Sequence, residues 1–64
     1  MPSQTFLNLA KEKQGSLLKA AFDEFSNYSY QEASINRIIK KANIPRGSFY
    51  AYFQDKQDLY FYLL

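Results

Sequence analysis

The sequence predicts an all-α fold, a small helical bundle of three helices plus the start of a fourth. Three observations predict it. Apolar residues recur at helical spacing along the 64-residue chain, polar turn formers and an internal proline divide this pattern into segments, and no repeat interrupts it. A chain of this length forms one domain and buries roughly 60% of the surface that its unfolded form exposes. The six Phe and six Tyr must therefore supply much of the core.

The first helix is expected over residues 5–27. Its signal is strongest from residue 16 onward, where one apolar face is formed by Leu17, Leu18, Ala21, Phe22 and Phe25. Phe6 and Ala10 extend this stripe towards the N-terminus. Gly15 weakens the same stretch by about 1 kcal/mol relative to alanine. The periodicity therefore defines the body of this helix better than its start.

The second helix is expected over residues 34–41. Residues 26–33 are polar turn formers that end the first helix, and Ser34 is a good N-cap because its hydroxyl can accept from an amide one turn into the helix. Asn43 tolerates the left-handed conformation that ends a helix. Pro45 then stops any continuation, and its fixed φ suits the start of a new helix.

The third helix is short and runs from Pro45 to residue 51 or 52. Phe49 and Phe53 are four residues apart, so both are expected to point inward. The centre of the core should form where three helices converge, from Phe25, Ile38, Phe49 and Phe53.

The fourth helix is expected to follow Asp55, which caps it, with Asp58 in the first turn where negative charge is favoured. It should run to the last residue. Residues 59–64 are apolar on every face of the expected helix, and a helix of this kind is usually buried in protein on every side. We therefore expect the helix to continue into a C-terminal domain that is absent from this sequence. A free end that frays is the other interpretation.

The composition excludes several classes of chemistry. The chain has neither cysteine nor histidine, which removes disulfides, thiolate metal sites, conventional zinc sites and nucleophilic catalysis with a histidine base. A chain this small cannot enclose a substrate. We expect no enzyme activity, no cofactor and no metal. No secretory signal and no apolar segment of about 20 residues is visible, so a cytoplasmic location is expected.

The basic charge is concentrated in one segment. The net charge is +2, yet residues 1–30 carry three lysines against three carboxylates and sum to zero. Residues 31–56 carry two carboxylates against five cations, Arg37, Lys40, Lys41, Arg46 and Lys56. Such a cluster is typical of a nucleic-acid-binding segment. An ordinary solvated helix face is the alternative interpretation.

The second and third helices, with the turn between them, form a helix-turn-helix over residues 34–53, of the homeodomain-like type. In this motif the second helix enters the major groove of DNA. Arginine donates two bonds to guanine, serine bonds to several bases, glycine lets the backbone approach closely, and tyrosine hydroxyls donate to phosphates. The face opposite the predicted core offers this mixture, as Arg46, Gly47, Ser48, Tyr50 and Tyr52.

Residues 17–59 resemble, without a gap, the DNA-binding domain of TetR-type (tetracycline-repressor-type) transcriptional regulators. The strongest stretch is residues 47–56, Gly-Ser-Phe-Tyr-Ala-Tyr-Phe-Gln-Asp-Lys, followed by Leu59. It is similar to the recognition helix of that family and the start of its fourth helix. Further matching residues are Leu17, Ala20, Ala21, Phe25, Tyr30, Ser34, Ile35 and Ile38.

The resemblance implies a set of DNA contacts. The positions that reach base edges in the family hold Arg46 and Ser48, and the position where the backbone nears the DNA holds Gly47. With the phosphate-contact positions and the first residue of the recognition helix added, the predicted set consists of Ser34, Pro45, Arg46, Gly47, Ser48, Tyr50, Tyr52 and Lys56.

Four positions depart from the family pattern, and at one of them Ile39 replaces a common alanine. The family usually has glycine where this chain has Ser29 and Asn43, and serine adopts left-handed turn geometry less readily than asparagine. A small hydroxyl residue usually caps the recognition helix where this chain has Pro45, whose side chain cannot cap.

The resemblance further implies a ligand-released repressor. The full-length protein would be a homodimer on a palindromic operator, with a small-molecule inducer bound by the C-terminal domain. The alternative function is a helical protein-interaction module or a membrane-surface helix, which the apolar C-terminal stretch supports. Salt-dependent affinity for duplex DNA discriminates between the two.

Overall fold

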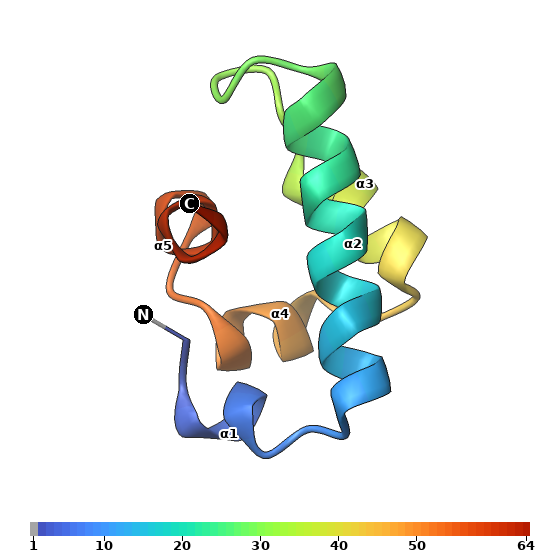
Figure 1. The fold of residues 1–64 in the computed structure, drawn as a ribbon, viewed down its shortest axis with the longest axis vertical. Helices are drawn as coiled ribbons and strands as arrows, with labels where there is room; N and C mark the ends of the chain where they lie inside the picture. Colours follow the sequence, from blue (N-terminus) through green and yellow to red (C-terminus); the bar gives the residue numbers. More distant parts are fainter. Residues whose placement is uncertain (1) are drawn as a thin grey trace.

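The computed structural model describes residues 2–64, and these form five helices and no strand (Figure 1). The all-α prediction is confirmed. The described part measures 29 × 21 × 20 Å along its principal axes. The helices are α1 (Gln4–Leu7), α2 (Lys11–Asn27), α3 (Ile35–Ala42), α4 (Arg46–Tyr52) and α5 (Lys56–Leu63). The long helix α2 packs against α3 and α5, while α4 packs against α1 and α3.

The predicted first helix, residues 5–27, is divided in two, so the prediction for its N-terminal part is wrong. Ala10 is extended, with ψ 144°, and α2 begins only after it. The break does not lie at Gly15, which is inside α2. The side-chain amide of Gln14 donates to the carbonyls of Leu7 (3.1 Å) and Leu9 (2.9 Å) and so fixes the turn. The bend directs α1 towards α4 rather than along the axis of α2.

The N-terminal segment is attached to the end of α4. The Ser3 amide donates to the Tyr52 carbonyl (2.8 Å), and the Ser3 hydroxyl donates to the Ala51 carbonyl (2.6 Å). The last carbonyls of a helix have no partner within it, so these bonds satisfy groups that α4 leaves free. Phe6 is completely buried, and its ring lies 5.0 Å from that of Phe53 and 6.0 Å from that of Tyr62, between centroids.

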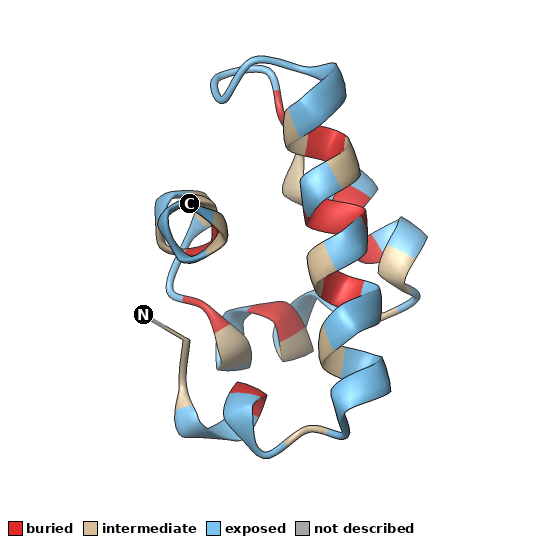
Figure 2. Cartoon of the chain, in the orientation of Figure 1, coloured by how far each residue is buried: buried red, intermediate tan, exposed pale blue. Residues whose placement is uncertain are grey.

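The core lies between the five helices, with α1 and the start of α5 each contributing one buried residue (Figure 2). Ile38, Phe49 and Phe53 are buried there, as predicted. Phe25 was expected at the centre but is only partly buried, and it contacts Tyr60 at the edge of the core. The remaining buried members are Phe6, Leu17, Ala20, Ala21, Ile39 and Leu59.

Phe22 was expected on the core face of the first helix, and this is wrong, because 63% of the residue is exposed. Its neighbour Ala21 is fully buried. Successive helical residues are rotated by about 100°, so a face that centres on Ala21 turns Phe22 towards solvent.

Two turns have the geometry that their sequences favour. Asn43 is left-handed, with φ 59°, and its amide and that of Ile44 donate to the last carbonyls of α3. It is the one non-glycine residue with positive φ among residues 2–64. Ser29 therefore does not need the conformation that glycine provides in the family. Asp55 caps α5 by accepting from the Asp58 amide (2.8 Å), as predicted.

Ion pairs join α3 to α2. The Glu24 carboxylate is almost buried, and it accepts from Arg37 Nε (2.8 Å) and from the Ser34 amide (2.8 Å). Burial alone would raise the pKa of Glu24, but the bonds from Arg37 and Ser34 outweigh it and hold the pKa below its ordinary value. Lys41 pairs with Asp23 at 2.8 Å and lowers the pKa of that carboxyl also. These contacts fix the first helix of the helix-turn-helix on α2.

Candidate nucleic-acid interface

The helix-turn-helix consists of α3, the turn 43–45, and α4. Pro45 is extended (φ −67°, ψ 151°) and makes no side-chain cap, while its carbonyl accepts from the amides of Ser48 (3.1 Å) and Phe49 (3.2 Å). The fixed φ of proline therefore sets the start of α4 in place of a capping hydroxyl. With Phe49 buried, the opposite side of α4 faces solvent.

The exposed face of α4 has a crest without bulky side chains. Gly47 and Ala51, one turn apart, are both exposed on it. A Cβ added at Gly47 would meet nothing within 4 Å, and the φ of Gly47 is not positive, so the fold itself does not require glycine there. Glycine near the start of a short helix destabilises it relative to alanine. The crest is thus shaped for close approach of an outside molecule to the helix backbone.

One flank of α4 holds Arg46 and Tyr50. The Arg46 guanidinium donates to the Asn36 side chain on α3 and to the Tyr50 hydroxyl (3.4 Å). It lies 5.5 Å from the centroid of the Tyr50 ring, in cation–π contact. Both residues are exposed. Their mutual contact pre-organises a cation and a hydroxyl beside the crest, so less side-chain entropy is lost when they bind.

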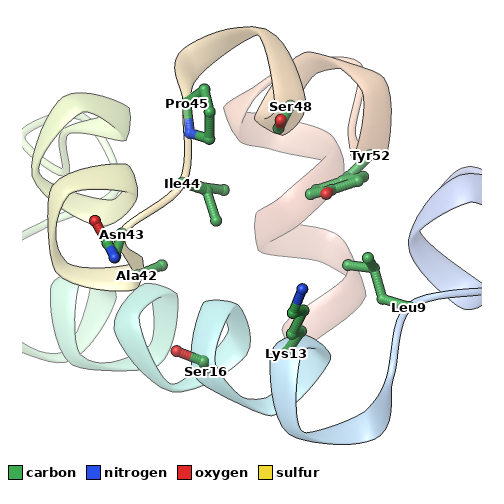
Figure 3. Close-up of a pocket in the computed structure, with 9 residues that line it drawn as sticks. All are labelled: Leu9, Lys13, Ser16, Ala42, Asn43, Ile44, Pro45, Ser48 and Tyr52. Atoms are coloured by element: carbon green, nitrogen blue, oxygen red, sulfur yellow. The ribbon is translucent and has the colours of Figure 1, made fainter.

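The other flank of α4 holds Ser48 and Tyr52, which are partly buried. They line a groove of about 450 Å³ between α4, the turn 43–45 and the start of α2 (Figure 3). Lys13 and Ser16 line it from the α2 side. Tyr52 also packs its ring 5.9 Å from that of Phe6, so it is less available to a ligand than Tyr50.

The last two members of the predicted set, Ser34 and Lys56, both make internal contacts. The Ser34 hydroxyl accepts from the Arg37 amide (3.3 Å) and caps α3, as predicted. The Lys56 ammonium donates to the carbonyls of Tyr30 (2.7 Å) and Ala33 (3.1 Å) and lies 4.7 Å from the centroid of the Tyr30 ring. Lys56 therefore holds the loop between α2 and α3, and its predicted phosphate contact stays a prediction.

Sequence reasoning missed three residues near this surface. Asn36 receives Arg46, Ser3 holds the end of α4, and Lys13 projects into the groove. Only Asn36 had a local signal, because it lies two residues after a helix cap on the exposed side of a predicted helix. Ser3 and Lys13 reach α4 from distant parts of the chain. Within residues 2–64, no helix is both long and apolar enough to cross a membrane.

Known proteins share this architecture. Residues 17–63 match the family model described as bacterial regulatory proteins, tetR family. A crystal structure of a TetR family transcriptional regulator from Chloroflexus aurantiacus J-10-FL superposes with a TM-score of 0.91 at 50% identity, over 97% of this chain and 29% of that one. The HTH-type transcriptional regulator YdgC of Bacillus subtilis (strain 168) is 43% identical over 49 residues, which cover 77% of this chain and 25% of YdgC.

A further relative is the transcriptional regulator AcuR of Cereibacter sphaeroides, 37% identical over 43 residues, which cover 67% of this chain and 20% of AcuR. The chain thus spans about a quarter of the length of the relatives it matches. The family match contains the whole helix-turn-helix and begins after residue 16, so the segment that holds the end of α4 lies outside it. The chain belongs to the tetR family of bacterial regulatory proteins.

Proposed function

We propose that this chain is the DNA-reading head of a transcriptional regulator, and that it binds double-stranded DNA sequence-specifically with α4 in the major groove. The observation that carries the proposal is the exposed face of α4. It combines a crest of small residues, Gly47 and Ala51, with the polar flank of Arg46 and Tyr50. A major groove about 12 Å wide admits one helix, and a crest without bulky side chains lets the helix backbone approach the base edges closely.

The flanks suggest a division of roles. Arg46 is the residue suited to bidentate contact with guanine, and Ser48 is a second base-reading candidate. Tyr50 and Tyr52 supply hydroxyls for phosphates, which position the protein without reading sequence. The proposed contacts also include Ser34 and Pro45, at the starts of α3 and α4.

Gly47→Ala tests the proposal, with Gly15→Ala as the matched control. Both glycines are exposed and helical, and a methyl group added to either would meet no atom within 4 Å beyond its own stretch of helix. Each substitution should stabilise the fold by up to about 1 kcal/mol. Only the variant at Gly47 should weaken binding to duplex DNA, because only there does the added methyl face the groove floor.

The measurement is binding to duplex DNA over a range of salt concentrations, with thermal melting of each variant. Phosphate neutralisation makes the logarithm of the binding constant fall linearly with the logarithm of salt concentration. Wild-type binding that is absent, or insensitive to salt, would refute the proposal and favour a protein-interaction module instead. Equal binding by the two alanine variants would refute the placement of the α4 crest in the groove.

We further propose that the full-length protein is a homodimer on a palindromic operator and acts in the cytoplasm as a ligand-released repressor. A C-terminal domain would supply the dimer contacts and the site for a small-molecule inducer. The length of the relatives supports a larger protein. Linking two heads makes the second contact intramolecular and raises affinity by about 10²–10⁴.

Fusion to an unrelated two-fold dimer tests this second proposal. Helix-turn-helix dimers place their recognition helices about 34–36 Å apart, one turn of DNA. A fusion with that spacing should bind a two-half-site duplex tightly, and the 64-residue chain should bind a half-site weakly. Nanomolar binding of a single half-site by the unfused chain at physiological salt would show that dimerisation is not the source of affinity.

A further inference from the structure

We infer that the groove between the start of α2 and α4 seats a backbone phosphate of bound DNA, with Lys13 as its cation. The inference rests on the proposed function, because it takes α4 to lie in the major groove. It adds a contact from outside the helix-turn-helix, at a residue that precedes the family match.

The groove has polar groups on facing walls. Lys13 and Ser16 come from α2, and Tyr52, whose hydroxyl the proposed function assigns to phosphate, comes from α4. Figure 3 shows the Lys13 ammonium directed into the groove, towards the side that carries Ser48 and Tyr52. A cation opposite a hydroxyl is a donor set that suits a phosphate oxygen, since both groups donate hydrogen bonds.

The position of the groove follows from the width of α4. A helix with its side chains is about 10–12 Å across, and the major groove is about 12 Å wide. When Gly47 and Ala51 face the groove floor, the two flanks of α4 must face the two phosphate backbones. Tyr50 then lies towards one backbone, and Tyr52 with the adjoining cavity lies towards the other.

Lys13 is available for such a contact, unlike the cations that pair within the fold. It is exposed, and residues 2–64 place no carboxylate within ion-pair distance of it. Arg37 and Lys41 form ion pairs with carboxylates of α2, and the Lys56 ammonium donates hydrogen bonds to loop carbonyls. Lys13 lies beside the recognition helix and has no ion pair to the described residues. Lys56, the cation predicted to contact phosphate, donates to loop carbonyls instead.

The start of α2 adds to the attraction. Its N-cap residue, Ala10, makes no side-chain cap, so the first amides of this 17-residue helix are not satisfied by a side chain. The positive end of the helix dipole therefore lies beside Lys13. Glu12 is also in the first turn, but it is exposed and does not line the groove.

The experiment compares Lys13→Gln with Lys19→Gln in the 64-residue chain. Both lysines are exposed on α2, and Lys19 does not line the groove. Binding to duplex DNA is measured from about 50 to about 200 mM salt. Lys13→Gln should weaken binding to all duplexes alike and reduce the salt slope by about 0.9, the value for one phosphate. Lys19→Gln should leave the slope unchanged, and Lys13→Arg, which keeps the charge, should retain it.

Failure of the inference and of the proposed function are separable. If the wild-type chain binds duplex DNA and Lys13→Gln keeps its affinity and slope, the inference is overturned and the proposed function stands. If the wild-type chain binds no duplex, the proposed function fails as well. A free anion is the other source of a phosphate group. Binding of inorganic phosphate to the free chain that is lost in Lys13→Gln, together with unchanged DNA affinity and salt slope in that variant, would assign the groove to a free anion and overturn the inference.

Discussion

Replacement of Phe6 by alanine tests whether the N-terminal segment is part of the fold. Phe6 is fully buried and contacts the rings of Tyr52, Phe53 and Tyr62. Truncation of a core phenylalanine costs about 3–5 kcal/mol. Because α1 has only four residues, it can shift into part of the space that the ring leaves, which reduces the cost of the cavity. We therefore expect the lower end of that range, about 3 kcal/mol.

That loss is large for a domain of this size. At about 0.05–0.15 kcal/mol per residue, a 64-residue domain has roughly 3–10 kcal/mol of stability in total. The assay is urea denaturation followed by far-ultraviolet circular dichroism. Phe22→Ala is the matched control, because it removes the same ring from a site that is 63% exposed, where a change within about 0.5 kcal/mol is expected. Similar losses in the two variants, or none in Phe6→Ala, would refute the packing of the N-terminal segment on α4.

Three further predictions concern the supports of the helix-turn-helix. Glu24 has a folded pKa below its ordinary value of 4.5, so its stabilisation is present above about pH 4.5 and is lost as the pH falls through the folded pKa. Urea titrations from pH 7 to pH 3 should show a larger loss in the wild type than in Glu24→Gln, in which the lowered pKa of Asp23 still contributes. Asn43→Ala should destabilise the fold by about 1 kcal/mol because φ is positive, whereas Asn43→Gly should be neutral or stabilising; equal melting of the two would contradict the left-handed turn. Lys56→Met should lower the melting temperature, because three loop carbonyls lose their hydrogen-bond donor. An unchanged melting temperature would show that Lys56 does not stabilise the loop and would leave DNA contact as its role.

The helix boundaries that depend on local signals were predictable from the sequence. Ser34 and Asp55 cap the helices that follow them, Asn43 takes the left-handed turn, and Pro45 starts α4 without a side-chain cap. Each of these outcomes depends on backbone preferences of one residue and its nearest neighbours. Such local preferences can be predicted from the sequence without knowledge of the rest of the fold.

The outcomes that depend on distant contacts were not predictable in this way. Phe6 and Phe22 have similar positions in the apolar stripe of the sequence, yet one is buried against α4 and the other faces solvent. The bend at Ala10, which periodicity does not encode, turns Phe6 onto α4, and the packing of α2 through Ala21 turns Phe22 towards solvent. Lys56 is a similar case, because the carbonyls that engage it lie more than twenty residues away in sequence. Composition and spacing indicate that Lys56 is a free cation. Its hydrogen bonds to the loop carbonyls become visible only when the loop is packed.

A base-pair scan of Arg46→Ala against the wild type tests most directly whether α4 reads DNA sequence. The dimeric fusion is used to select a preferred duplex from a random pool, and every base pair of that duplex is then substituted in turn. Arg46→Ala should lose about 1–3 kcal/mol per half-site on the preferred duplex and should no longer discriminate at one position in each half-site, with discrimination elsewhere unchanged. An equal loss on every sequence would show that Arg46 contacts only phosphate and would contradict sequence reading by this residue.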